Sequence, residues 1–217
     1  MTIRHQFRSR LELKSIEGFP YQIKLESENL KNFFAGLDID FVRIFQFDAE
    51  IYLYFESEKN IPTFEWPSPL RTLFDKWPSE AGLRSSVAMM DIFHDAMPRQ
   101  SEAWRTVDAK RESIGSVIYL RPEKYASYVF YHFQLQEEGI KKFNKYFIIG
   151  SNENLLFSYH ELPAVIDTYS SDKILSTNHS PDAWAELMAE HFSPWSEGLN
   201  VDAPWKIMKT IFEMGEN

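Results

Sequence analysis

The chain of 217 residues contains no cysteine. Disulfide bonds, thiolate nucleophiles and cysteine-ligated zinc sites are therefore excluded. It also lacks any apolar run near the ~20 residues that a membrane-spanning helix needs. The first 14 residues carry Arg4, Arg8 and Arg10 without an apolar segment, which does not fit a secretory signal. These features predict a cytoplasmic protein with no membrane partner.

Positive charge is also scarce, because 23 Lys and Arg stand against 32 Asp and Glu, a formal net charge of -9. Such a surface repels phosphate backbones, so we expect no nucleic-acid partner. Uncharged small molecules are unaffected by this charge and stay open as ligands. Aromatic residues are abundant at 16%. They fit either a core rich in Phe and Tyr or stacking surfaces for the C–H faces of a sugar ring.

One order of elements is predicted twice along the chain. The first half is expected to contain, in order, a strand at Pro20–Leu25, a helix opening at Ser27, hairpin strands at Phe41–Phe47 and Ile51–Phe55, a helix at Arg84–Ala96 and a closing strand at Trp104–Val107. The second half is expected to contain a strand at Gly115–Leu120, a helix opening at Pro122–Tyr125, hairpin strands at Tyr146–Ile149 and Leu155–Tyr159, a helix at Asp182–Phe192 and a closing strand at Trp205–Phe212.

The order β-α-β-β-α-β is that of the ferredoxin-like unit. We therefore predict an α+β protein with two tandem ferredoxin-like units, at residues 1–108 and 109–217, joined through the charged stretch Asp108–Ile114. One four-stranded sheet with helices on one face leaves its other face bare, so the two sheets are expected to pack face to face as an intrachain dimeric α/β barrel. Such an internal pseudo-dimer predicts a monomer or a weak homo-oligomer. Residues Arg4–Leu13 precede the first unit as a candidate edge strand.

The second half contains a series of short motifs in a characteristic order: Arg121-Pro122-Glu123-Lys124, the spacing Tyr128-x-x-x-His132, Asn154-Leu155-Leu156-Phe157, Trp184-x-x-x-Met188, and Pro204-Trp205 through Phe212. In their order and spacing, these motifs resemble the L-rhamnose mutarotase family over nearly all of the second half. The resemblance implies a dimeric α/β barrel that interconverts the anomers of an aldose. It places His132 at the catalytic acid, Tyr128 at a substrate-contacting tyrosine and Trp184 at the first of two sugar-stacking tryptophans.

Several positions depart from this family. Ala185 stands where the second tryptophan belongs, and Phe143 stands at a substrate-contacting tyrosine and lacks its hydroxyl group. In the first half, Leu30–Phe34 replaces the Tyr-x-x-x-His spacing, and Met89 and Met90 occupy the tryptophan pair. We therefore expect the first unit to be a degenerate structural partner and the second to hold the site.

The residues themselves are compatible with such chemistry. Mutarotation moves one proton onto the ring oxygen and another off the anomeric hydroxyl group, and it needs no cofactor or metal. Histidine titrates near neutrality, which suits both directions. Tyr128 and His132 are four residues apart and share one face of a predicted helix. The same pair, and Trp184 likewise, also fits an ordinary place at the edge of the core.

Three functions follow from the sequence. The first is an aldose mutarotase that acts on a small sugar through His132. The second is a sugar-binding module without catalysis, because a tyrosine and a tryptophan are missing. The third is a different enzyme on the same barrel, a cofactor-free or haem-dependent oxygenase, since fold does not decide function. A metal site of His132, His160, Glu161, His191 and Glu190 is not supported by any close His-x-x-x-His spacing.

Overall fold

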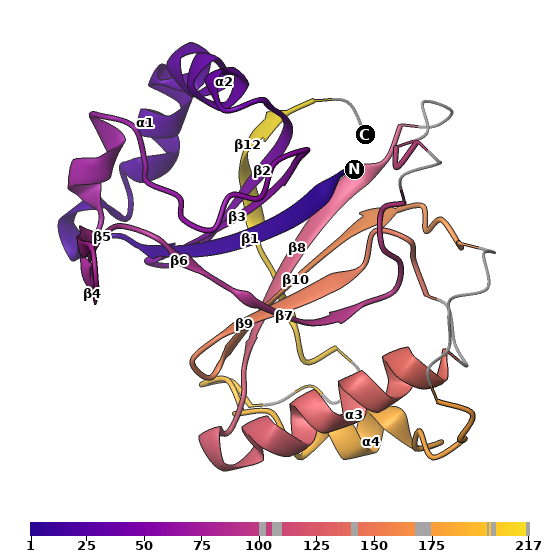
Figure 1. Ribbon diagram of the computed structural model, residues 1–217. Helices are drawn as coiled ribbons and strands as arrows, with labels where there is room; N and C mark the ends of the chain where they lie inside the picture. Colours follow the sequence, from indigo (N-terminus) through magenta and orange to yellow (C-terminus); the bar gives the residue numbers. More distant parts are fainter. Residues whose placement is uncertain are drawn as a thin grey trace. The chain divides into compact units, whose positions relative to one another are not determined.

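The computed structural model describes residues 1–99, 103–105, 110–139, 143–167, 175–198, 200 and 203–215. The chain forms two compact units (Figure 1), the first comprising Met1–Met89, Pro98–Lys110 and Met208–Asn217, and the second comprising Met90–Met97 and Arg111–Ile207. Each unit contains a five-stranded antiparallel sheet with helices on one face, which confirms the predicted α+β class. The expected face-to-face packing of the two sheets stays a prediction.

The sheet of the first unit has the strand order β12-β2-β3-β1-β6. Its strands are β1 (Ile3–Arg10), β2 (Ile39–Phe47), β3 (Glu50–Ser57), β6 (Val87–Ala88) and β12 (Lys209–Met214). The order β6-β1-β3-β2 within it is the ferredoxin-like order, with β12 added at the edge. The other elements of this unit are η1 (Leu13–Ser15), α1 (Phe19–Leu25), α2 (Ser27–Gly36), η2 (Leu70–Leu73), β4 (Trp77–Ser79) and β5 (Gly82–Arg84).

The sheet of the second unit repeats this arrangement, with the order β11-β8-β10-β9-β7. Its strands are β7 (Met90–His94), β8 (Glu112–Tyr119), β9 (Ile148–Asn152), β10 (Leu155–Leu162) and β11 (Lys206–Ile207). The helices η3 (Pro122–Lys124), α3 (Tyr125–Glu138) and α4 (Trp184–Ala189) complete the unit. Here β11-β8-β10-β9 is the ferredoxin-like order, and β7 is the added edge strand.

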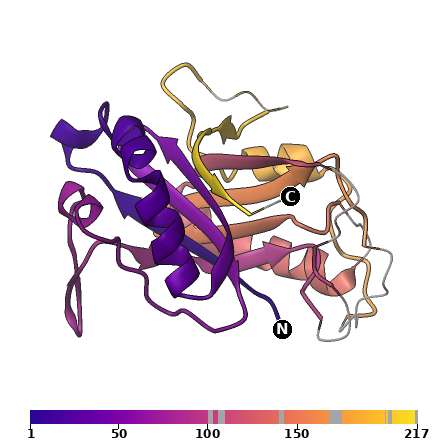
Figure 2. The same cartoon turned by 90° about the horizontal axis from the view of Figure 1, so that it is seen from above.

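The two units do not coincide with the two halves of the sequence, because the closing segment of each half contributes one strand to each of the two sheets. In the first half, β6 pairs with β1 while β7 pairs with β9. In the second half, β11 pairs with β8 while β12 pairs with β2, beside which it runs in Figure 2. A single residue, Met89 or Met208, separates the two strands each time. Each sheet therefore takes its fifth strand from the other half of the sequence.

Two predicted elements of the first half are wrong. Pro20–Leu25 belongs to helix α1, in which Phe19 and Ile23 are buried at helical spacing. The opening strand is instead β1, in the region proposed only as an edge strand. Arg84–Ala96, predicted as a helix, contains β6 and β7, whose backbone groups pair with sheet edges. The closing strand expected at Trp104–Val107 lies partly outside the described residues, as does the connecting stretch Asp108–Ile114.

The closing strand predicted at Trp205–Phe212 is instead two strands, β11 and β12, in different sheets. The other elements confirm the sequence analysis to within a few residues at their ends. Both hairpins form, and each turns through two residues with the first in the left-handed region, Asp48 (φ 50°) and Glu153 (φ 55°). In the second unit, α3 begins after Pro122 and ends where Gly139 adopts φ 55°. The predicted helix at Asp182–Phe192 is the shorter α4. In the described part of the chain, no helix is both long and apolar enough to cross a membrane.

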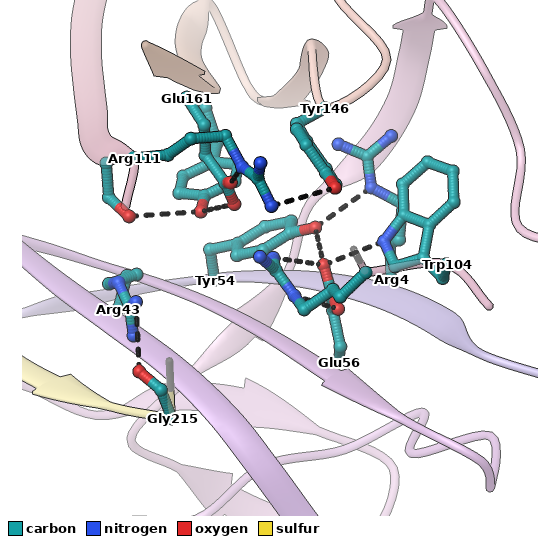
Figure 3. A network of polar contacts seen from close by, with 12 residues as sticks. Arg4, Arg43, Tyr54, Glu56, Trp104, Arg111, Tyr146, Glu161 and Gly215 are labelled. Atoms are coloured by element: carbon teal, nitrogen blue, oxygen red, sulfur yellow. Dashed lines mark hydrogen bonds and ion pairs between the residues drawn. The ribbon is translucent and has the colours of Figure 1, made fainter. Parts of the chain in front are cut away.

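Each unit also contains a buried polar network built on one repeated motif, Tyr-x-Glu. On β3, the Tyr54 hydroxyl donates to Glu56 at 2.6 Å, and on β10 the Tyr159 hydroxyl donates to Glu161 at the same distance. The Arg105 guanidinium donates to both oxygens of Glu56, at 2.8 and 2.7 Å. The Arg111 guanidinium donates to Glu161 at 3.1 Å (Figure 3). The two halves thus share a structural device beyond their element order.

Candidate functional site

A cavity of about 230 Å³ lies in the second unit, lined by residues of α3, α4 and the sheet. The four residues singled out from the sequence, Tyr128, His132, Phe143 and Trp184, all line it. The other lining residues are Phe93, Leu135, Phe147, Ile149, Ala185, Met188, Phe192, Pro204 and Trp205. No charged side chain occurs among the described residues of this lining. The cavity is therefore strongly apolar and aromatic.

Helix α3 supplies the two polar side chains of the cavity. Tyr128 and His132 are four residues apart, 1% and 5% exposed, with ring centroids 4.0 Å apart. The His132 Nδ1–H donates to the Tyr128 carbonyl oxygen at 2.9 Å, which leaves Nε2 as the acceptor of a neutral ring. Among the described residues, neither His132 Nε2 nor the Tyr128 hydroxyl group forms a hydrogen bond. Two unpaired polar groups in an apolar cavity indicate a ligand with complementary groups.

Burial sets the protonation state of both groups. It lowers the pKa of His132 to about 4, against a smaller raising effect of the bond to the Tyr128 carbonyl, and His191 lowers it further. Burial also raises the pKa of Tyr128 well above its usual range. At neutral pH the cavity therefore presents an uncharged imidazole acceptor and an uncharged phenol. At neutral pH His132 therefore offers a hydrogen-bond acceptor at Nε2 and has no proton there to donate.

Trp184 and Phe143 form parts of the wall near His132. Trp184 is the first residue of α4, and its ring meets the His132 ring edge-on with centroids 5.0 Å apart. The segment that carries Phe143 is held by Asp95, whose Oδ2 accepts bonds from the backbone N–H groups of Phe143 and Asn144 at 2.8 and 2.7 Å. Phe143 is 41% exposed, which places it at the mouth of the cavity.

Sequence reasoning missed much of the aromatic lining. Phe93 on β7, Phe147 before β9, and Phe192 and Trp205 after α4 all line the cavity. They come from segments up to 112 residues apart, and each looks like an ordinary core residue in the sequence. The closeness of Phe143, Tyr146 and Phe147 in the sequence could have indicated Phe147, whereas no such cluster surrounds Phe93 or Trp205. Ala185 lies at the mouth, where the family pattern would place a second tryptophan.

The candidate metal ligands are not brought together. His160 and Glu161 are neighbours on β10 and project from opposite faces of the strand. His191 bonds to Ser127 and to the Leu187 carbonyl oxygen instead. Over the residues that the structure describes, no group of three His, Asp or Glu side chains is placed to hold a metal ion.

Comparisons with known proteins add little to this geometry. No family model matches the chain, and no curated protein matches it. Among solved structures, the chain is similar to a "Putative monooxygenase" from Fusobacterium nucleatum subsp. nucleatum, at 9% identity and a TM-score of 0.42. The match covers 99% of this chain and 94% of that one. A likeness at this level carries no activity over to this chain.

Proposed function

We propose that the second unit binds a small, flat, largely apolar molecule that carries one hydroxyl group. The observation that carries this proposal is the aromatic cavity with a single neutral imidazole acceptor, His132 Nε2, in its wall. At about 230 Å³ the cavity is smaller than the ~300–1,000 Å³ of pockets for drug-sized ligands, so the ligand has one or two rings. The ligand is uncharged, because the described lining offers no partner for a charge.

The hydroxyl group of the ligand would donate to His132 Nε2 and accept from the Tyr128 hydroxyl. The neutral His132 ring would orient and polarise this hydroxyl group through the hydrogen bond without taking its proton, because burial disfavours the charged imidazolium. Of the functions raised by the sequence, an oxygenase that acts on a hydroxylated ring fits this lining best. A sugar fits it less well, since it would leave several hydroxyl groups without partners.

The first test compares 1-naphthol with 1-methylnaphthalene, which has nearly the same shape but no hydroxyl group. We expect the protein to bind 1-naphthol about tenfold more tightly, because one hydrogen bond contributes ~1–1.5 kcal/mol. In His132→Ala most of this preference should be lost, because only the Tyr128 bond remains, while 1-methylnaphthalene still binds. Isothermal titration calorimetry measures both dissociation constants.

The matched control is His179→Ala, because the His179 side chain is exposed and lies outside the cavity lining. It should keep the preference for 1-naphthol. If His132→Ala kept the full preference for 1-naphthol, His132 would not be the acceptor of the ligand's hydroxyl group. Failure of the unmodified protein to bind either compound would contradict the proposed function itself.

An aldose mutarotase is the second candidate, favoured by the convergence of Tyr128, His132 and Trp184 on one cavity. Saturation transfer between the α and β anomeric protons of rhamnose, fucose and other aldoses tests it. We expect no acceleration of exchange at pH 7, because His132 is unprotonated there and has no proton to give to the ring oxygen. Acceleration that disappears in His132→Ala would establish the mutarotase in place of the first proposal.

A further inference from the structure

We propose that Glu138 is a positioning residue, a latch that holds the Trp184 end of α4 against the cavity. This inference rests on the proposed function of the cavity, whose wall Trp184 forms. Glu138 is the last residue of α3, lies outside the cavity lining and is 1% exposed. A carboxylate so deeply buried requires partners, and its partners identify what it holds.

The Glu138 carboxylate accepts five hydrogen bonds. Gln134 Nε2 donates from the preceding turn of α3 at 3.1 Å. The other four donors come from a segment about 40 residues later in the chain: Thr177 Oγ1 at 2.7 Å, His179 N at 2.8 Å, Ser180 N at 3.0 Å and Ser180 Oγ at 2.6 Å. One side chain therefore fixes the segment that leads into α4.

These bonds also keep the carboxylate charged. Burial acts to raise the pKa of Glu138, but the bonds from Ser180, His179, Thr177 and Gln134 outweigh it and hold the pKa well below its usual range. Glu138 is thus ionised throughout the neutral range, and its hydrogen bonds are of the stronger, charge-assisted kind. An uncharged replacement of the same shape would hold the segment less firmly.

The two ends of α4 are secured in different ways. Beyond its C-terminal end, the His191 carbonyl oxygen accepts from Arg121 N at 2.8 Å, and Ser193 N donates to the Tyr119 carbonyl oxygen at 2.8 Å. At its N-terminal end, Ala183 offers no side-chain cap. Trp184 follows only four residues after Ser180, the last residue bound to Glu138. Release of Glu138 would therefore free the Trp184 end while the other end stays in place.

The consequence concerns access to His132. The Trp184 ring lies edge-on to the His132 ring, so movement of this end of α4 would widen the cavity beside the imidazole. A ligand would lose stacking contact, and water would reach Nε2. Glu138 would then control the affinity of the cavity without touching the ligand.

The test uses 5-fluorotryptophan-labelled protein and ¹⁹F NMR, with the Trp184 resonance assigned by Trp184→Phe. In Glu138→Ala we expect the Trp184 resonance of the free protein to shift and broaden, and the Trp66 resonance of the first unit to stay unchanged. The dissociation constant for 1-naphthol should rise about tenfold. Glu138→Gln keeps an acceptor oxygen but loses the charge, so its Trp184 resonance and its dissociation constant should be intermediate. Glu137→Ala is the matched control on the same helix and should leave the two tryptophan resonances and the dissociation constant unchanged.

An unchanged Trp184 resonance in both Glu138 variants would overturn the proposal, whether or not the ligand binds. A Trp184 response in protein that binds no probe would support the latch and contradict the proposed function instead. If Glu138→Ala fails to fold, Glu138→Gln provides the same comparison. Equal shifts of the Trp66 and Trp184 resonances in the variants would indicate a general loss of structure and would also overturn the proposal.

Discussion

Replacing Arg111 by methionine is expected to lower the free energy of unfolding by about 3–5 kcal/mol, the usual effect of leaving a buried charge without its partner. The Arg111 and Glu161 side chains are 3% and 0% exposed, and their closest atoms are 3.1 Å apart. Arg111 also donates to the Tyr146 hydroxyl group at 3.4 Å. In Arg111→Met the Glu161 carboxylate keeps the Tyr159 bond but loses the Arg111 guanidinium.

Urea unfolding followed by circular dichroism measures this effect. Arg111→Met/Glu161→Leu should recover much of the lost stability, because an apolar pair often replaces a buried ion pair at little cost. The Tyr159 and Ser113 hydroxyl groups already bond to each other at 3.2 Å, so Tyr159 keeps a partner in the double variant. Lys110→Met is the control at the exposed neighbouring position. A loss in Arg111→Met no larger than that of Lys110→Met would show that the ion pair contributes little.

The second large effect is a loss of stability in mild acid that depends on His132. Burial lowers its pKa from 6.5 to about 4. Between these two pH values the unfolded chain binds a proton that the folded chain does not, so folding weakens as the pH falls. The loss begins near pH 6.5, amounts to ~1.4 kcal/mol per pH unit and reaches about 3 kcal/mol near pH 4. Above pH 6.5 this residue contributes no dependence on pH.

Because other groups titrate in the same range, the measurement is a difference between two proteins. Urea unfolding of the natural protein and of His132→Phe at pH 7.5, 6.5, 5.5 and 5 should show the natural protein losing stability faster, with the two curves parallel above pH 6.5. His179→Ala should follow the natural protein throughout. If the free energies of unfolding of the natural protein and of His132→Phe changed in parallel over the whole pH range, the pKa of His132 would not be lowered by burial.

Part of the lining of the candidate cavity could be predicted, because Tyr128, His132 and Trp184 lie on well-marked helices. A proline start signal and helical spacing indicated α3, and a resemblance to a family supplied Tyr128, His132, Phe143 and Trp184 together. Their convergence depends on the path of the whole chain, which local patterns do not contain. The Glu138 latch could not be found from sequence, since four of its five donors lie about 40 residues further along and are ordinary Thr and Ser hydroxyl groups or backbone amides.

The errors in the fold have two physical causes. Short apolar runs such as that in α1 suit a helix as well as a strand, so periodicity alone cannot separate them. Strand β1 was predicted only as a candidate edge strand, because Arg4, Gln6 and Arg8 make one of its faces look like solvent-exposed surface. In the structure these side chains find partners: Arg4 bonds to Tyr54, and Arg8 bonds to Glu50 at 2.8 Å. The repeated Tyr-x-Glu motif on β3 and β10 would have linked the two halves more directly than element order did.

The division of each closing segment between two sheets bears on how the protein can be cut. A polypeptide that ends at residue 108 lacks β12, and the edge of β2 is then left without its partner. The complementary piece lacks β7, which leaves the edge of β9 unpaired. Exposed strand edges of this kind are prone to join other chains. Each piece alone is therefore expected to aggregate, whereas the two expressed together can supply each other's missing strands, which makes the protein a natural template for a split reporter.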